Sequence, residues 1–340
     1  MKRIPVFLIV CILASCQFPV YFENTSVQPL TIEVLLPASG VFIPTPGKIL
    51  VFPGNKAETR VYVNGSEDTS FRNLNQETLF VITDGVIERL GDSPSLVPVA
   101  LPPDRIPAPA KPAKKLTWEQ IDALAAPDTC STVLTIDQCI AVNEAYTEQS
   151  SSFYSLDVYY SVIAETEIYV RWTLYDREKR MLEEQDTTIH TRQVTNWLPT
   201  PDEAFDELPP PEDIISQTAR ETGFAIASTI SPIWQAATRY YFSSGSKDMR
   251  TAAGFISSGE FAKADSIWSI LENMRNRGIA YHAAYNRIII EEINGNLVGA
   301  KDKAEKLWRE CRMTEAQKYL QLLEKRIREQ EIILRQMGVK

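Results

Sequence analysis

The sequence predicts an α+β protein in which a mixed α/β sheet domain with a long antiparallel hairpin precedes an all-helical module. Three observations predict this fold class. Apolar and mixed positions alternate along residues 158–175, as in a strand with one buried face. Apolar residues recur with a helical period within residues 74–90. After about residue 247 the strand patterns end and only helical patterns follow.

Residues 1–15 have the features of a secretory signal peptide. Lys2 and Arg3 give a basic start, residues 6–14 are apolar, and small residues precede Cys16, which is the order that such signals share. The apolar run is shorter than the roughly twenty residues that a membrane-spanning helix needs. The sequence L-A-S-C that ends this segment matches the bacterial lipobox, so we expect Cys16 to be lipidated after cleavage.

A lipid on Cys16 would anchor the mature chain to a membrane, because each buried methylene of an acyl chain contributes about 0.8 kcal/mol. Residues 16–28 would then be the lipidated cysteine and a tether. Gln17 stands where an aspartate would favour the inner membrane. We therefore expect the outer membrane, with the protein facing the periplasm or the cell surface. The alternative is a plain secretory signal that is cut without lipidation.

Composition limits the partners. Removal of residues 1–15 leaves 33 lysine and arginine residues (35 − 2) against 44 aspartate and glutamate residues, a formal charge of −11. This acidic balance argues against nucleic acid as a partner. Of the cysteines after the anchor, Cys130, Cys139 and Cys311, an odd number cannot all pair. An extended chain from Cys130 to Cys139 spans about 30 Å, beyond disulfide reach, so free thiols are expected.

Residues 29–242 are expected to form the sheet domain. Strands are predicted at 30–36, 48–52, 95–101, 132–136, 158–175 and 181–193, with a bend before Glu165 in the long one. Helices are predicted at 74–90, 117–126 and 214–228. The second begins with Thr117 and Gln120, which match a capping box. Loops are expected at the Pro-rich residues 102–115, the polar residues 137–152 and the acidic residues 198–211.

Residues 243–340 are expected to form the helical module. Helices are predicted at 249–257, 281–293 and 314–337, and two more follow Gly259 and Gly295. The last two segments both fit G-x-[FL]-x-x-A-x-x-x-[WA], and Ala300 follows Ala264 by 36 residues, close to the period of about 34 in tetratricopeptide repeats. The module therefore resembles these repeats, although the early aromatic and the closing proline are missing. A generic helical bundle is the alternative.

Residues suited to catalysis are few. The chain has two histidines, His190 and His282, and neither has a partner at metal-ligand spacing. Sequence motifs of phosphate-binding loops, zinc proteases and serine hydrolases are absent. The acidic residues within 202–213 lack the spacing of a calcium loop, so a solvated loop is expected. We therefore expect no cofactor, no metal and no enzymatic activity, with carboxylates that converge from separate loops as the exception to test.

Several stretches together resemble an uncharacterised family of Bacteroidota envelope lipoproteins with a domain of unknown function and C-terminal tetratricopeptide-like helices. Besides the lipobox, they are V-L-L-P-A at 34–38, L-G-D-S-P at 90–94, W-T-L-Y-D at 172–176, I-S-P-I-W at 230–234, and the helices around 284–286 and Gly295. The resemblance implies an outer-membrane lipoprotein and no reaction. The order of elements is also similar to the small domain of curli-secretion lipoproteins, which is an analogy of fold alone.

The functional expectation is a non-enzymatic, lipid-anchored scaffold or adaptor that holds a protein partner on its C-terminal helices, as helical solenoids commonly do. The candidate partner-binding residues are Tyr285, Asn286, Glu292 and Lys301. One alternative is an envelope hydrolase that uses carboxylates from separated loops. Another is a glycan or small-ligand binder with exposed aromatic residues, for which the candidates are Tyr159, Tyr160, Tyr169, Tyr240 and Tyr241.

Overall fold

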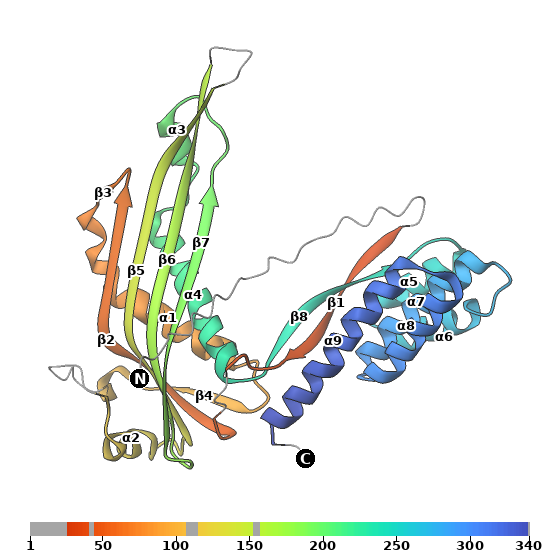
Figure 1. The fold of residues 1–340 in the computed structure, drawn as a ribbon, viewed down its shortest axis with the longest axis horizontal. Coiled ribbons are helices and arrows are strands. Elements are labelled where there is room, and N and C mark those ends of the chain that lie inside the picture. The colour runs from red at the N-terminus through yellow and green to blue at the C-terminus, as the bar shows by residue number, and fades with distance from the viewer. Residues whose placement is uncertain (1–25, 41–43, 107–114, 152–156, 339–340) are drawn as a thin grey trace, which may run out of the picture. The chain divides into compact units, whose positions relative to one another are not determined.

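The structure is a computed structural model that describes residues 26–40, 44–106, 115–151 and 157–338 (Figure 1). The expected signal peptide, Cys16 and most of the expected tether lie outside these residues. The chain divides into two compact units. Unit 1 is Ala38–Ile233, and unit 2 joins residues 26–37 to the C-terminal part that begins at Trp234. None of the helices in the described ranges is long and apolar enough to cross a membrane.

A six-stranded mixed sheet forms the centre of unit 1. Its strands are β2 (Gly47–Val63), β3 (Ser66–Glu67), β4 (Leu96–Ala100), β5 (Thr132–Ser151), β6 (Val158–Asp176) and β7 (Met181–Val194). The order is β3-β2-β5-β6-β7, and β4 also pairs with β2. β2 is parallel to β4 and β5, whereas β5, β6 and β7 are successively antiparallel. The mixed sheet and its long hairpin are thus confirmed.

Helices α1 (Leu74–Leu90) and α4 (Pro211–Ile230) cover one face of this sheet (Figure 1). The apolar stripe of α1 packs on β2 and is buried in one core with its inward residues Ile49 and Val51. The two helices approach most closely at Gly85 and Gly223. A Cβ atom on Gly223 would lie 2.3 Å from the carbonyl oxygen of Ile82. Small residues at this crossing therefore allow the two backbones to touch.

Part of the opposite face is covered by α2 (Trp118–Ala125), whose core includes Val133 and Tyr175. The capping box is confirmed: the Gln120 N–H donates to Thr117 Oγ1 over 3.4 Å, and the Thr117 N–H donates to Gln120 Oε1 over 2.9 Å. Cys130 on this side and Cys139 on the other are buried free thiols, as expected. Burial raises the pKa of Cys139 to about 12, which makes this thiol unreactive.

Two expected strand ends in unit 1 are wrong. β2 does not stop at Pro53 but passes an irregularity between Pro53 and Lys56 and continues to Val63. Residues 137–151, expected as a loop, are the second half of β5. Their polar sequence does not predict a strand, but they pair with β2 on one side and with β6 on the other. Backbone pairing with two neighbours thus outweighs the weak local preference.

Two further expectations for unit 1 are corrected. β6 pairs with β7 in one continuous register, and the irregularity expected before Glu165 lies instead on β5, between Ile136 and Gln138. The acidic loop contains a short helix, α3 (Pro201–Asp206). It begins where the Thr200 side chain accepts a hydrogen bond from the Glu203 N–H, and Pro201 occupies a first-turn position. Both features favour a helix start.

The described part of unit 2 contains a two-stranded sheet and five helices. The sheet pairs β1 (Val27–Leu36) with β8 (Ile233–Phe242). The helices are α5 (Lys247–Ser257), α6 (Phe261–Leu271), α7 (Arg277–Ile293), α8 (Leu297–Cys311) and α9 (Thr314–Gln336). Each helix packs against the next one in the chain, as in repeat arrays. The five predicted helices and the helical module are confirmed.

The two related segments have the same turn. Gly259 and Gly295 adopt φ values of 73° and 76°, which only glycine takes without strain. In each turn the next residue donates a backbone hydrogen bond to a carbonyl five residues earlier, from Glu260 to Phe255 and from Asn296 to Glu291. The same backbone geometry therefore recurs after 36 residues.

Strand β8 was not expected. Its inward side chains include Arg239 beside Ile233 and Tyr241, so the simple apolar alternation of a half-buried strand is missing. The expected domain boundary followed residue 242, whereas the compact units divide at residues 233 and 234. Because β8 and β1 pack on the helices, both strands belong to unit 2.

Candidate functional site on the helical unit

Helix α7 binds an extended segment of the same chain. The Phe242 N–H donates to Asn286 Oδ1 over 2.8 Å, and Asn286 Nδ2 donates to the Phe242 carbonyl oxygen over 2.7 Å. Asn286 is fully buried. One side-chain amide thus satisfies both backbone groups of the last residue of β8, which buried backbone groups require.

Aromatic rings surround this clamp. The Phe242 ring stacks on His282, with centroids 3.8 Å apart and an interplanar angle of 12°. Tyr285 meets Phe242 edge to face at 5.3 Å and Tyr319 at 5.7 Å. Burial lowers the pKa of His282 and raises the pKa of Tyr285. The end of β8 is therefore held by ring packing around one amide.

A buried ion pair secures the middle of β8. Arg239 Nε and Nη2 donate to the two carboxylate oxygens of Glu292 on α7 over 2.9 and 2.7 Å. Both side chains are buried, at 8% and 2% exposure. Such a fork-to-fork geometry is among the strongest that arginine and carboxylate form. The pair connects the strand to the helix in a fixed register.

Helix α9 completes the network. The Tyr319 hydroxyl also donates to Glu292, and Arg326 Nε lies 3.7 Å from the same carboxylate. Arg326 Nη1 donates to the Leu35 carbonyl oxygen of β1 over 2.8 Å. Burial alone would raise the pKa of Glu292, but the hydrogen bonds and positive charges around it lower this pKa. Glu292 is therefore the carboxylate on which α7, α9 and β8 converge.

The predicted partner-binding residues divide into two groups. Tyr285, Asn286 and Glu292 lie together in the interior of unit 2, where they hold β8. Lys301 is half-buried and lies on the next helix, α8, whereas the other three residues lie on α7. Arg239 was not among the predicted residues, and the available signal was an arginine between the uncharged residues of 233–242. The helical face expected to hold a partner thus binds a strand of its own chain.

The other face of β8 carries exposed side chains. Even-numbered residues Trp234, Ala236, Thr238 and Tyr240 are exposed, with Trp234 at 43% and Tyr240 at 44%. Successive side chains of a strand point to opposite faces. Because Arg239 and Tyr241 are buried, these four positions form the outer face of the strand, which ends before the buried Phe242. Two large aromatic side chains on a firmly held strand form a surface suited to binding.

Comparison with known proteins shows which family this chain represents. Residues 56–242 match the Domain of unknown function (DUF8603), which is more than half of the chain and ends with β8. The chain belongs to the DUF8603 family. Residues 250–325 of this DUF8603 protein, from α5 into α9, match the Domain of unknown function (DUF6340). Both are families of unknown function, and the expectation of an uncharacterised family is confirmed in this form. No curated protein matches.

Solved structures show only distant similarity to the DUF8603 chain. A neuraminyllactose-binding hemagglutinin homolog from Helicobacter pylori is 12% identical, with 66% of this chain and 96% of that chain covered and a TM-score of 0.26. The PelC dodecamer from Paraburkholderia phytofirmans is 10% identical, with coverage of 61% and 98% and a TM-score of 0.21. Hypothetical protein CT253 from Chlamydia trachomatis is 14% identical, with coverage of 53% and 99% and a TM-score of 0.22. Scores this low support no argument about function.

The hydrolase alternative requires two carboxyl groups that interact, and Asp137 and Glu184 of unit 1 are such a pair. Asp137 lies at the β5 irregularity, where Thr135 and Thr173 each donate a hydroxyl hydrogen bond of 2.5 Å to it. Glu184 on β7 is in register with Thr173 and forms an ion pair with Lys115 at 2.5 Å. Burial raises the pKa of Asp137, and the charge of Glu184 raises it further. Both Asp137 oxygens accept hydrogen bonds from unit 1 itself, which favours a structural role in the DUF8603 fold.

The candidates for glycan or metal binding are scattered. Tyr241 is buried, Tyr160 packs in a small core, and Arg171 donates to the Tyr169 hydroxyl over 2.8 Å. Tyr159 and Tyr240 are exposed but belong to different units. Within the described ranges, no group of three or more histidine, cysteine, aspartate or glutamate side chains is placed to hold a metal ion. His190 is exposed on β7.

Proposed function

We propose that this protein is a non-enzymatic scaffold or adaptor, held at the outer membrane by a lipid on Cys16, that binds a protein partner through unit 2. The outer face of β8 supports the proposed binding of a partner. Trp234 and Tyr240 are exposed there, while the inner face of the strand is held by the helices. Trp and Tyr are enriched among the few residues that supply most of the binding energy of protein interfaces.

Rigidity supports this role. The Arg239–Glu292 ion pair and the Asn286 clamp fix β8 at two points along the strand. A binding surface that is already ordered loses less entropy when a partner arrives. The buried residues would therefore act indirectly, by holding the exposed aromatic side chains in place.

The lipid anchor rests on the sequence. The basic start, the apolar run and L-A-S-C before Gln17 form the signal, and the family resemblance implies the same location. Anchoring would confine the partner to the membrane surface and raise its effective concentration there.

Replacement of the anchor residue tests the location. We expect Cys16→Ala to move the protein from the membrane pellet to the soluble fraction, because an acyl chain is then absent and the described helices offer no membrane span. Membrane fractionation with incorporation of labelled fatty acid measures this. Ser15→Ala, which leaves the cysteine, is the control and should remain in the pellet. Retention of Cys16→Ala with the membrane would contradict the anchor.

The partner surface is tested by photo-crosslinking in intact cells. A photoreactive amino acid at Tyr240 should give a discrete protein adduct, and Trp234→Ala in the same chain should weaken it by about tenfold or more, as removal of a hot-spot tryptophan does. Phe80 on α1 is 42% exposed, and the same probe there serves as the control. Equal adducts at both positions, or none at Tyr240, would contradict the proposal.

A further inference from the structure

Strand β7 forms one long edge of the unit 1 sheet. It spans 14 residues and pairs with β6 without interruption from Val194 to Met181. Among the described strands, β7 has no neighbour on its other side. The opposite edge differs, because β2 is irregular near Pro53 and its ends are covered by β4 and β3. Proteins usually protect edges in such ways, and a regular, uncovered edge is a template for another strand.

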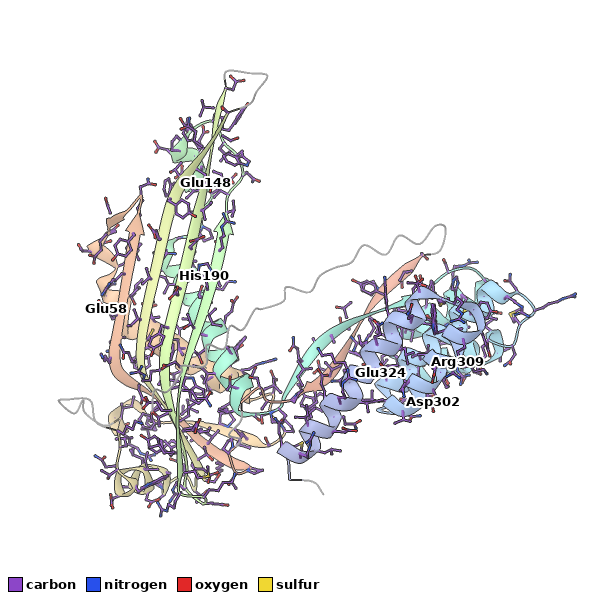
Figure 2. All side chains as sticks on the ribbon, viewed as in Figure 1. Glu58, Glu148, His190, Asp302, Arg309 and Glu324 are labelled. Atoms are coloured by element: carbon purple, nitrogen blue, oxygen red, sulfur yellow. The ribbon has the colours of Figure 1, made fainter. Side chains whose placement is uncertain are left out.

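The side chains on one face of β7 are arranged symmetrically about Thr188. These residues are Leu182, Glu184, Asp186, Thr188, His190, Arg192 and Val194. Apolar residues lie at both ends, at 38% exposure for Leu182 and 56% for Val194. The acidic residues precede Thr188 and the basic ones follow it. Figure 2 shows the labelled His190 on β7, at this edge of the sheet.

Such a strand is complementary to a reversed copy of itself. We propose that two copies of this chain pair antiparallel along β7, with Thr188 opposite Thr188 of the second copy. In this register Leu182 faces Val194, Glu184 faces Arg192, and Asp186 faces His190. Directly opposite residues on one face of an antiparallel pair interact, and apolar or opposite-charge pairs are favourable. The interface would join two six-stranded sheets into one continuous sheet.

The charges of β6 fit the same arrangement. Within one chain, Arg171 pairs with Asp186 over 3.0 Å and Glu165 with Arg192 over 3.5 Å. His190 is in register with Glu167. Across the proposed seam, Arg192 would lie between two carboxylates, Glu165 of its own chain and Glu184 of the second copy. Asp186 would lie between Arg171 of its own chain and the His190 ring of the second copy. The alternation of charge between β6 and β7 therefore continues into the second copy.

Neighbouring registers lose this match. Successive side chains of a strand alternate between its two faces. A shifted register therefore keeps the same side chains on one face only if each residue faces a partner two positions further along. One such shift places Leu182 opposite Arg192, and the other places Glu184 opposite Val194. Each shift keeps one pair of a carboxylate and a basic residue, Glu184 with His190 or Asp186 with Arg192. Both shifts nevertheless leave one apolar end unpaired and separate the Glu184–Arg192 pair, so fewer favourable pairs remain. The sequence of β7 thus favours the register centred on Thr188.

Cysteine cross-linking of the purified full-length chain in detergent tests this register. We expect Thr188→Cys to form a covalent dimer with mild oxidation or a short thiol cross-linker, because the two cysteines would be direct neighbours. Asp186→Cys is the matched control on the same strand and face. Its two copies would be four residues apart along the strands, about 14 Å, and should not link. The unsubstituted chain gives the background from its own cysteines.

Sedimentation of the full-length chain without cross-linking provides the second measurement. Thr188 is exposed, and Thr188→Lys would place two like charges opposite each other. We therefore expect the dissociation constant of the dimer to rise by about fivefold or more. A chain that sediments as a monomer would overturn the proposal. So would equal cross-linking at positions 186 and 188, or a dimer that is unaffected by Thr188→Lys, since either result places the contact elsewhere.

Discussion

Glu292→Gln is expected to lower the free energy of unfolding of unit 2 by about 3–5 kcal/mol, the usual effect of removing one partner of a buried ion pair. The substitution keeps the shape of the side chain but leaves Arg239 buried without its negative partner, beside Arg326. Hydrogen exchange of the α7 backbone amides in the full-length chain, followed by mass spectrometry, measures the loss in unit 2 directly.

The same substitution has a defined pH dependence. The pKa of Glu292 is lowered in the folded chain, despite its burial, by Arg239, Tyr319 and Arg326. Its contribution to stability is therefore present above the unfolded pKa of glutamate and is lost as the pH falls through the lower folded value. The free energies of unfolding of the parent chain and of Glu292→Gln should therefore become more alike as the pH falls.

Glu291→Gln is the matched control for this prediction. Glu291 is the neighbouring residue on α7 and forms a more exposed ion pair with Lys303 at 2.6 Å. Partly exposed pairs contribute about 0–1 kcal/mol. An equal loss of protection in both variants would show that the buried network has no special role in holding β8.

Gly223→Ala is expected to lower the stability of unit 1 by about 3 kcal/mol, at the upper end of what overpacking usually costs. The new Cβ would lie 2.3 Å from the Ile82 carbonyl oxygen and 2.7 Å from the Val86 nitrogen, both backbone atoms of α1. Backbone atoms cannot rotate away as a flexible side chain can. The helices must separate, and the buried stripe of α1 then loses contact with α4.

Urea denaturation of the full-length chain measures this effect, and Gly254→Ala is its control. Gly254 lies inside α5, where an added Cβ meets no atom within 4 Å. Alanine in an open helical position stabilises by about 0.5–1 kcal/mol relative to glycine. The two identical substitutions should therefore have opposite signs. A neutral Gly223→Ala would contradict the close approach of α1 and α4.

The elements predicted correctly have local causes. The stripe of α1, the capping box at Thr117 and the turns at Gly259 and Gly295 depend on residues within a few positions of one another. The β6–β7 hairpin is also local, because a short turn joins its strands. Such features can be read from one segment at a time.

The elements that were missed depend on distant partners. The polar half of β5 is a strand because β2 and β6 pair with it on both sides. β8 is a strand because β1, more than 200 residues earlier, pairs with it, as the bond from the Ser243 N–H to the Ser26 carbonyl oxygen illustrates. A pattern within 233–242 cannot reveal these partners.

The candidate site shows the same division. Tyr285, Asn286 and Glu292 could be selected from the sequence because they occupy one predicted helix. Their role was decided by Phe242 and Arg239, which reach them only in the folded unit. Residues expected to bind a partner therefore bind the chain's own strand, and the exposed aromatic residues lie on the other face of that strand.

The sequence by itself determined the fold class, the helices other than α3, the hairpin and the expectation of an anchor at Cys16, since each is encoded by neighbouring residues. Only the tertiary structure decided that β8 joins β1 on the helices and that Glu292 is buried between Arg239 and Tyr319. It also decided that β7 has β6 as its single neighbour among the described strands. The physical reason is that burial and strand pairing are properties of residues far apart in the chain, whose contacts exist only after folding.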